Sequence, residues 1–275
     1  YNPKSGNALT AKGLRAKCKA AGIEIERLIS MSDNFEKKLT PFLNKRTVIA
    51  VIGGDGTVSS VAGIVVGTKA VLAPLPGGTL NHFTKDLGIP QDIDKALLRL
   101  ATAKQKLVDV ATVNGQVFVN NSSLGLYSSS LLMRENLENK LGKWIATVVA
   151  SVSAIFNFQV FQVRVNGEAF HTPFIFVGNN DYKLDEVGGA QRMRLDEGIL
   201  GVFVAKTQAR SSLIKIALWA VVGKAKVLDE FDVYTTKKLT IETKRRQLHV
   251  SRDGEVGKMS SPLHYAIQKK ALNIL

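Results

Sequence analysis

The strongest constraint on the fold is the apolar run Val48-Ile49-Ala50-Val51-Ile52, which passes directly into Gly53-Gly54-Asp55-Gly56-Thr57. A short run of mostly β-branched residues that ends in glycine is typical of a strand buried on both faces of a parallel sheet. We expect a helix to begin near Thr57. Glycines let the backbone approach a ligand closely, and amides at a helix N-terminus suit phosphate oxygens. A carboxylate among such amides, Asp55, favours a divalent cation shared with a nucleotide, whereas the structural alternative is a plain strand–helix turn.

The first hundred residues alternate between helical and strand patterns, which predicts an α/β domain with a doubly wound, three-layer arrangement around a parallel sheet. The strand over 70–75 ends in Pro76-Gly77-Gly78-Thr79-Leu80-Asn81, a second glycine loop. Both glycine loops therefore follow strands, at the sheet edge where ligands of such folds bind. The patterns predict helices over 8–21, 35–43, 58–66 and 92–103, and strands over 23–29, 48–52 and 70–75.

From about residue 107 the pattern changes to short strands, which predicts a mainly antiparallel β-sandwich as the second domain. The dipeptides Asn114-Gly115 and Asn166-Gly167 are typical of hairpin turns. Residues 144–163 carry no charge, but their polar residues and change of spacing favour an amphipathic helix that runs into a strand over a membrane span. The predicted strands are 108–113, 116–120, 158–165, 174–177, 199–205, 231–235, 239–243 and 247–251, with helices near 130–154 and 211–222.

Composition and charge narrow the class of partner. The 275 residues include 37 Lys and Arg against 23 Asp and Glu, a formal charge of +14 that favours anionic partners. Aromatic residues make up 7% of the chain without alternating with basic ones, so we expect no nucleic-acid partner. The single cysteine, Cys18, fits a reducing compartment, and no secretory signal opens the chain. These features predict a cytoplasmic protein.

Five motifs, in this order, resemble the diacylglycerol kinase catalytic-domain family, most closely its soluble bacterial lipid kinases. Sphingosine, ceramide and NAD kinases are relatives. The resemblance covers nearly the whole chain and implies a nucleotide domain over 1–107 and 264–275, a lipid-substrate domain over 108–263, and an active site in the cleft between them. Family members carry an apolar strand before the first motif, so the resemblance predicts that the natural N-terminus is missing. The motifs are Asn2-Pro3-Lys4-Ser5-Gly6, Gly53-Gly54-Asp55-Gly56-Thr57, Pro76-Gly77-Gly78-Thr79-Leu80-Asn81, Leu87-Gly88-Ile89-Pro90 and Asp253-Gly254-Glu255.

The implied activity is transfer of the γ-phosphoryl group of ATP, with Mg²⁺, to a lipid hydroxyl. The acceptor would be of the diacylglycerol type, met by peripheral association with an anionic membrane surface. Such an enzyme is a transferase of phospholipid metabolism, and a homodimer remains open. The resemblance implies an ATP site at Asn2, Pro3, Ser5, Gly6, Ser30, Gly53, Gly54, Gly56, Thr57, Gly78, Thr79 and Asn81.

Carboxylates would carry the chemistry. By the resemblance, Asp55 and Asp109 belong to a catalytic Mg²⁺ network, either directly or through water, although a strand-edge Asp bonded to amides is an equal interpretation of Asp109. One carboxylate of Asp253-Gly254-Glu255 would accept the proton of the lipid hydroxyl. We favour Glu255 as the base with Asp253 as orienter or metal partner, and the exchange of these two roles stays open. An Asp-Gly hairpin turn is the structural alternative.

A second, structural Mg²⁺ is implied at Asp196, because Leu195-Asp196-Glu197-Gly198 resembles the segment that holds it in some bacterial relatives. Arg192 and Arg194 stand near the place of a further acidic residue and disfavour that metal.

Two further departures bear on activity. Ser59-Ser60 replaces the usual Asn-Glu pair after the first glycine loop, and His82 replaces a common Asp, so the site has lost possible anions. Two alternatives stay open: an enzyme similar to NAD kinase, and a nucleotide- or lipid-binding regulator without catalysis, in which these losses would be signs of decay. The lipid-type motifs at Asn2 and Asp253 argue against the first, and the retained Asp55, Asp109, Asp253 and Glu255 argue against the second.

Overall fold

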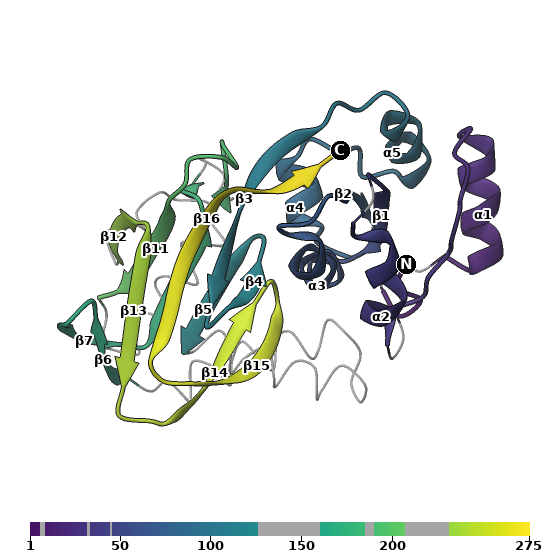
Figure 1. Ribbon diagram of the computed structural model, residues 1–275. Coiled ribbons are helices and arrows are strands. Elements are labelled where there is room, and N and C mark those ends of the chain that lie inside the picture. The colour runs from purple at the N-terminus through teal and green to yellow at the C-terminus, as the bar shows by residue number, and fades with distance from the viewer. Residues whose placement is uncertain (6–8, 32–33, 45, 126–159, 185–189, 207–230) are drawn as a thin grey trace, which may run out of the picture. The chain divides into compact units, whose positions relative to one another are not determined.

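The structure is a computed structural model that describes residues 1–275 except 6–8, 32–33, 45, 126–159, 185–189 and 207–230 (Figure 1). The chain forms two compact units. Unit 1 comprises Tyr1–Val110, Val117–Asn120 and Gln268–Leu275, and unit 2 comprises Ala111–Gln116 and Asn121–Ile267. Unit 1 is an α/β domain and unit 2 is an antiparallel β domain, which is the predicted fold class.

Most of the unit boundaries fall inside strands. The strands β3 (Lys106–Val113) and β16 (Leu263–Ile274) each supply residues to both units. Residues 117–120 also lie in unit 1, although the sequence motifs placed them in the second domain. Periodicity alone gives no sign of where a continuous strand passes from one core to another, because its alternation of side chains does not change there.

Two parallel strands form the centre of unit 1. In β1 (Val48–Gly53) and β2 (Val71–Pro76) the register places Gly53 beside Pro76, so both strands end at the same edge. All six residues of β2 are buried, as expected for an apolar run in a parallel sheet. Ile274 of β16 pairs in parallel with Leu72 on the other side of β2.

Four of the helices in unit 1 correspond to predicted ones, and their ends follow from local chemistry. The Asp92 side chain accepts from the Lys95 amide and caps α5, and the Thr10 side chain accepts from Gly13 and caps α1. The short α4 was not predicted, because one helical turn leaves no periodic pattern. The helices are α1 (Ala11–Ala20), α2 (Phe35–Leu39, followed by a 3-10 turn over Thr40–Phe42), α3 (Asp55–Val65), α4 (His82–Asp86) and α5 (Ile93–Leu100).

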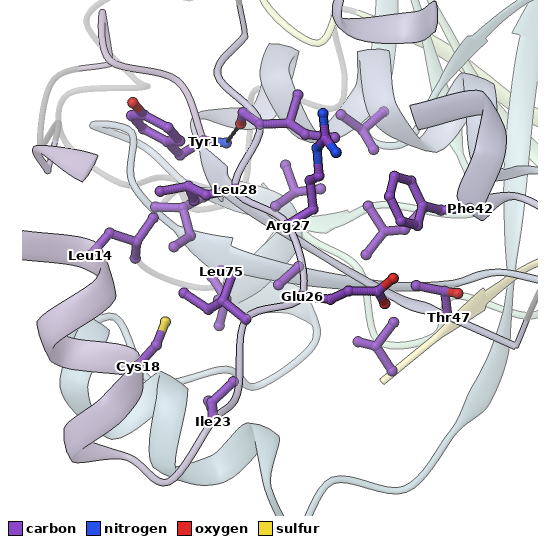
Figure 2. Close-up of a pocket in the computed structure, with 18 of the residues that line it drawn as sticks. Tyr1, Leu14, Cys18, Ile23, Glu26, Arg27, Leu28, Phe42, Thr47 and Leu75 are labelled. Carbon is purple, nitrogen blue, oxygen red and sulfur yellow. Dashed lines mark hydrogen bonds between the residues drawn. The ribbon is translucent and has the colours of Figure 1, made fainter. Parts of the chain in front are cut away.

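The predicted strand over 23–29 is wrong. These residues form no strand, and both they and residues of β1 line a cavity of about 460 Å³ (Figure 2). Leu14, Cys18 and Leu28 line this cavity. The Tyr1 amine donates to the O atom of Ile29, the last residue of the segment, at 2.8 Å. The next residue, Asn2, donates from its backbone N to Ile52 O of β1 at 3.0 Å. The segment alternates Ile and Glu as a strand would, but it does not pair with a neighbouring strand, and a strand requires such pairing.

The described part of unit 2 contains two larger sheets and the small two-stranded sheet β10-β9. One has the antiparallel order β12-β11-β8-β5-β14-β15, and in the other β7 pairs with β6, β6 with β13, and β13 with the first residues of β16. The turns Asn114-Gly115, Asn166-Gly167 and Asp253-Gly254 have positive φ at both residues, which confirms the predicted Asn-Gly hairpin turns. The strands of unit 2 are β5 (Asn121–Gly125), β6 (Phe161–Val165), β7 (Glu168–Thr172), β8 (Phe174–Asn179), β9 (Lys183–Leu184), β10 (Ala190–Gln191), β11 (Leu200–Ala205), β12 (Phe231–Thr236), β13 (Lys238–Thr243), β14 (Gln247–Arg252) and β15 (Glu255–Ser260), with β4 (Gln116–Phe118) bordering both units.

The predicted helices near 130–154 and 211–222, and the first part of the uncharged stretch 144–163, lie outside the described residues. Among the residues that are described, no helix combines the length and the apolar character needed to cross a bilayer.

A buried pair of hydroxyls links the two larger sheets of unit 2. Tyr265 of β16 lies 3.2 Å from the hydroxyl of Ser122 on β5, and both side chains are buried. Burial raises the pKa of Tyr265 from 10.0 to about 12, against the opposing effect of the Ser122 hydrogen bond. The unfolded chain therefore loses this proton at lower pH than the folded chain does.

We expect Tyr265→Phe to lower the free energy of unfolding at neutral pH by about 1 kcal/mol, the net value of a buried hydrogen bond. Between pH 10 and about 12 the folded protein binds the Tyr265 proton more tightly, so stability falls as pH rises, and the variant should lose less stability over this range. Urea unfolding at a series of alkaline pH values measures both effects. Equal alkaline losses in the two proteins would contradict the assignment.

Candidate functional site

Two glycine loops meet backbone to backbone where β1 and β2 end. Gly77 N donates to Gly53 O at 3.1 Å. A Cβ added to Gly77 would lie 2.7 Å from Gly53 N, and one added to Gly78 would overlap Gly54 Cα. Side chains are therefore excluded at this contact, and the site consists mainly of main-chain groups, which is how proteins commonly bind phosphates.

The first loop leads directly into α3. Gly54, in an extended conformation, is the N-cap residue and has no side chain with which to cap the helix. The first amides of a helix have no partner within the helix, and its N-terminus carries a partial positive charge. Gly56 and Thr57 lie in this first turn, so their surroundings favour an anion.

The carboxylate of Asp55 is fixed by three donors. His82 N donates to one oxygen at 3.1 Å, and Phe83 N donates to the other at 2.9 Å. The Asn120 side-chain amide donates to that second oxygen at 3.0 Å. Asp55 thus connects α3 to the start of α4, and its oxygens still offer lone pairs to a further ligand.

Asn81 shapes the second loop. Its backbone is left-handed, with φ of 52°, and its side chain both accepts from Gly78 N at 2.8 Å and donates to Gly78 O at 3.1 Å. These bonds close the loop around Thr79, which is exposed. Gly78, one of the residues expected to bind the nucleotide from this loop, lies next to Gly54.

The N-terminal loop reaches the same strand end. The Asn2 side chain donates to Thr57 Oγ1 at 2.9 Å and accepts from Lys4 N at 2.9 Å. Ser5 Oγ donates to Asn2 O at 3.0 Å, which keeps the turn through Pro3 closed. Ser30 is half-buried beside Tyr1, and Gly6 lies outside the described residues.

The other two predicted metal ligands, Asp109 and Asp196, each contact a different protein group. Asp109, 1% exposed, accepts from Lys270 N at 2.7 Å, which agrees with the amide-bonded interpretation of this residue. Asp196 forms an ion pair of 3.0 Å with Arg194. In the described part of the chain, His, Cys, Asp and Glu side chains form no group of three that could hold a metal ion. A Mg²⁺ site here would need phosphate and water ligands, which this ion normally retains.

The two candidate catalytic carboxylates of unit 2 have different surroundings. Asp253 is buried, with φ of 47°, and its side chain accepts from Asn121 N at 3.0 Å. Its own amide donates to Asn121 O at 2.9 Å, so this residue fastens the β14–β15 turn to β5. Glu255, the first residue of β15, is exposed. The geometry thus gives Asp253 a structural task and leaves Glu255 accessible.

Sequence reasoning missed Asn120 and the two amides at the start of α4. Asn120 is the last residue of the strand predicted over 116–120 and is 2% exposed, so a buried amide that needs partners was the available signal. Of the departures, Ser59 is buried with its hydroxyl 3.4 Å from Val117 O, and the side chain of His82 is exposed while its amide contacts Asp55.

Comparison with known proteins places these loops in context. Residues 1–113 match the family model of the diacylglycerol kinase catalytic domain. A diacylglycerol kinase of Bacillus subtilis (strain 168) is 26% identical over 277 residues, covering 94% of this chain and 89% of that protein. A probable lipid kinase, YegS-like, of Klebsiella pneumoniae (strain 342) is 31% identical over 159 residues, covering 55% of this chain and 52% of that protein.

Solved structures share the fold. The crystal structure of a diacylglycerol kinase from Bacillus anthracis str. Sterne matches with a TM-score of 0.68 at 21% identity, covering 99% of this chain and 93% of that chain. A second solved structure from the same strain matches with a TM-score of 0.75 at 25% identity, covering 99% and 94%.

Two glycine-to-alanine substitutions should change the stability of the protein in different directions. We expect Gly78→Ala to lower the free energy of unfolding by at least about 2 kcal/mol, because the new methyl group meets backbone that cannot move aside. The control Gly63→Ala lies within α3, where the nearest atom to an added Cβ is 3.6 Å away. It should be neutral or stabilise by up to about 1 kcal/mol. Chemical denaturation measures both, and equal effects would contradict the close loop contact.

Proposed function

Residues 1–113 belong to the diacylglycerol kinase catalytic-domain family, and from that premise we propose that this protein is an ATP-dependent lipid kinase. It would transfer the γ-phosphoryl group to the hydroxyl of a lipid, with a diacylglycerol-type acceptor. The observation that carries the proposal is the pair of glycine loops at the ends of β1 and β2, with the carboxylate of Asp55 held between α3 and α4.

In this proposal the glycine loops bind the triphosphate. Phosphoryl transfer depends on positioning and charge stabilisation more than on covalent chemistry. Amides of Gly54, Gly56 and Thr57 would contact phosphate oxygens, and Asn2 would hold Thr57 in place from the N-terminal loop. Thr79 and Asn81 would bound the nucleotide from the second loop.

The residues of unit 1 fit a Mg²⁺ that is shared with the nucleotide. Mg²⁺ commonly binds one or two carboxylates together with substrate phosphates and water, and it neutralises charge on the transferred group. Asp55 would hold it through a water, because three protein donors already fix the carboxylate. Asp109 is buried against Lys270 N, so we assign it a supporting part and no direct ligand role.

Glu255 would act as the base. Its exposed carboxylate accepts the proton of the acceptor hydroxyl, while the oxygen of that hydroxyl forms a bond to the γ-phosphorus. The bond from the γ-phosphorus to the bridging oxygen breaks, and ADP leaves. Asp253 would position the turn that carries Glu255, because its own oxygen is bonded to Asn121 N. The proposal requires the nucleotide held by unit 1 to reach this acceptor.

The acceptor would be met at a membrane surface. The formal charge of +14 favours association with anionic lipid, at about 1 kcal/mol for each Lys or Arg near the surface. We therefore propose a peripheral association with a cytoplasmic membrane face, without a bound nucleic acid.

Incubation with labelled ATP, Mg²⁺ and a panel of lipids in mixed micelles tests the proposal. Label on a lipid is the expected result, and the labelled species names the acceptor. Label on NAD would instead favour an enzyme similar to NAD kinase. Nucleotide binding without transfer to any acceptor would favour a regulator.

Three carboxylate variants separate the assigned roles. We expect Asp55→Asn and Glu255→Gln to lower kcat by on the order of 10²–10⁴-fold, because each loses a charge that acts during transfer. Asp253→Asn keeps an acceptor oxygen for Asn121 N and should retain most of the activity. Steady-state kinetics with equal folded fractions provide the measurement. A larger loss for Asp253→Asn than for Glu255→Gln would reverse the assignment of the base.

Asn120→Ala tests the positioning of Asp55. Removal of one of the three donors should let the carboxylate move and lower kcat by roughly tenfold, the equivalent of one hydrogen bond to a charged group. The KM for the lipid should stay unchanged, since Asn120 belongs to unit 1. A changed lipid KM with normal kcat would argue against this role.

A further inference from the structure

A second cavity, of about 320 Å³, lies within unit 2 where its two larger sheets approach each other. Leu124 and Leu248 come from one sheet, and Phe161 and Thr243 come from the other. Leu124 and Leu248 are buried and form an apolar part of the lining, which we call the apolar floor, while Gln162, Thr243 and Gln247 add polar groups to the lining.

The rim of the same cavity is basic. The turn between β13 and β14 carries Lys244, Arg245 and Arg246, all exposed, and the first two line the cavity together with His249. Lys258 of β15 lies opposite His249 in the β14–β15 register and is also exposed. No Asp or Glu is among the described residues that line the cavity. We name this feature, Lys244 to Arg246 with the cavity beside it, the basic rim.

We propose that the basic rim is a docking site for an anionic phospholipid of a membrane. A phospholipid head presents a phosphate next to the first carbons of its chains, and the cavity presents cations next to an apolar floor. Each basic side chain near an anionic surface attracts it, and the aliphatic stems of Lys and Arg cover apolar surface.

This inference deepens the proposed function, on which its biological purpose rests, but binding to vesicles does not require phosphoryl transfer. The two can therefore fail separately. A protein that binds anionic vesicles through the basic rim without phosphorylating any lipid would contradict only the proposed function.

The test compares co-sedimentation with vesicles of phosphatidylcholine alone and of phosphatidylcholine mixed with phosphatidylglycerol. We expect binding to the mixed vesicles only. The triple variant Lys244→Ser, Arg245→Ser, Arg246→Ser should lower the partition coefficient on the order of 100-fold, from three basic side chains near the surface. Backbone oxygens of Arg245 and Arg246 accept bonds from Thr243 and Ser261, and these bonds survive the substitutions. A circular dichroism spectrum and a thermal melt like those of the parent protein show that the triple variant is folded.

A matched variant removes three exposed lysines from unit 1: Lys12→Ser, Lys37→Ser, Lys38→Ser. It loses the same charge and should bind the mixed vesicles almost normally. Equal losses in both triple variants would show a diffuse attraction by net charge and overturn the proposal. Glycerol phosphate could also be added at the same phosphate concentration as the vesicle lipid. If it displaced the protein from the vesicles, the proposal would be overturned, because the apolar floor would then contribute nothing to binding.

Two further outcomes decide the nature of the site. If the triple variant of the basic rim loses binding to single-stranded RNA but still binds the mixed vesicles, the basic rim is a nucleic-acid site and the proposal is overturned. If the same triple variant no longer transfers the phosphoryl group to a short-chain, monodisperse lipid acceptor, the cavity is part of the acceptor site. That result would also overturn the proposal. Unchanged transfer to that acceptor, together with lost vesicle binding, is the expected result.

Discussion

The close approach of two main-chain segments at the ends of β1 and β2 is the constraint on which the rest of unit 1 depends. The parallel register sets Gly53 beside Pro76, so the following residues must pass each other without side chains. Larger residues would separate the loops and remove the amides from a common surface. The shape of this candidate phosphate site is thus a consequence of backbone packing, and the side chains around it act mainly by fixing that backbone.

Asp55 illustrates how one side chain can serve stability and, in the proposed function, chemistry as well. Its bonds to two amides of α4 and to Asn120 tie together three segments that are distant in the sequence. A carboxylate fixed in this way needs little reorganisation when charge changes nearby, which is the property expected of a catalytic site. Asp253 has a comparable arrangement in unit 2, where its bond to Asn121 N orders a turn and leaves the neighbouring Glu255 exposed.

Several elements could be predicted because their causes are local. The strands β1 and β2 follow from continuous apolar runs, α1 and α5 from helical spacing and side-chain caps, and the hairpin turns from Asn-Gly pairs. The segment over 23–29 has an equally clear alternation but forms no strand, because pairing depends on a neighbour that its own residues cannot supply. Strand β5 was not predicted, since its small polar residues carry no apolar alternation.

The sequence by itself determined the chemistry of the candidate site: which loops lack side chains, where carboxylates stand among them, and that the chain carries a large positive charge. These properties belong to single residues and short motifs. Only the tertiary structure decided that Gly78 lies against Gly54, that Asn120 supports Asp55, and that Asp253 is engaged while Glu255 is exposed. Each of these relations joins residues that are separated along the chain, and such contacts depend on how whole strands and helices pack.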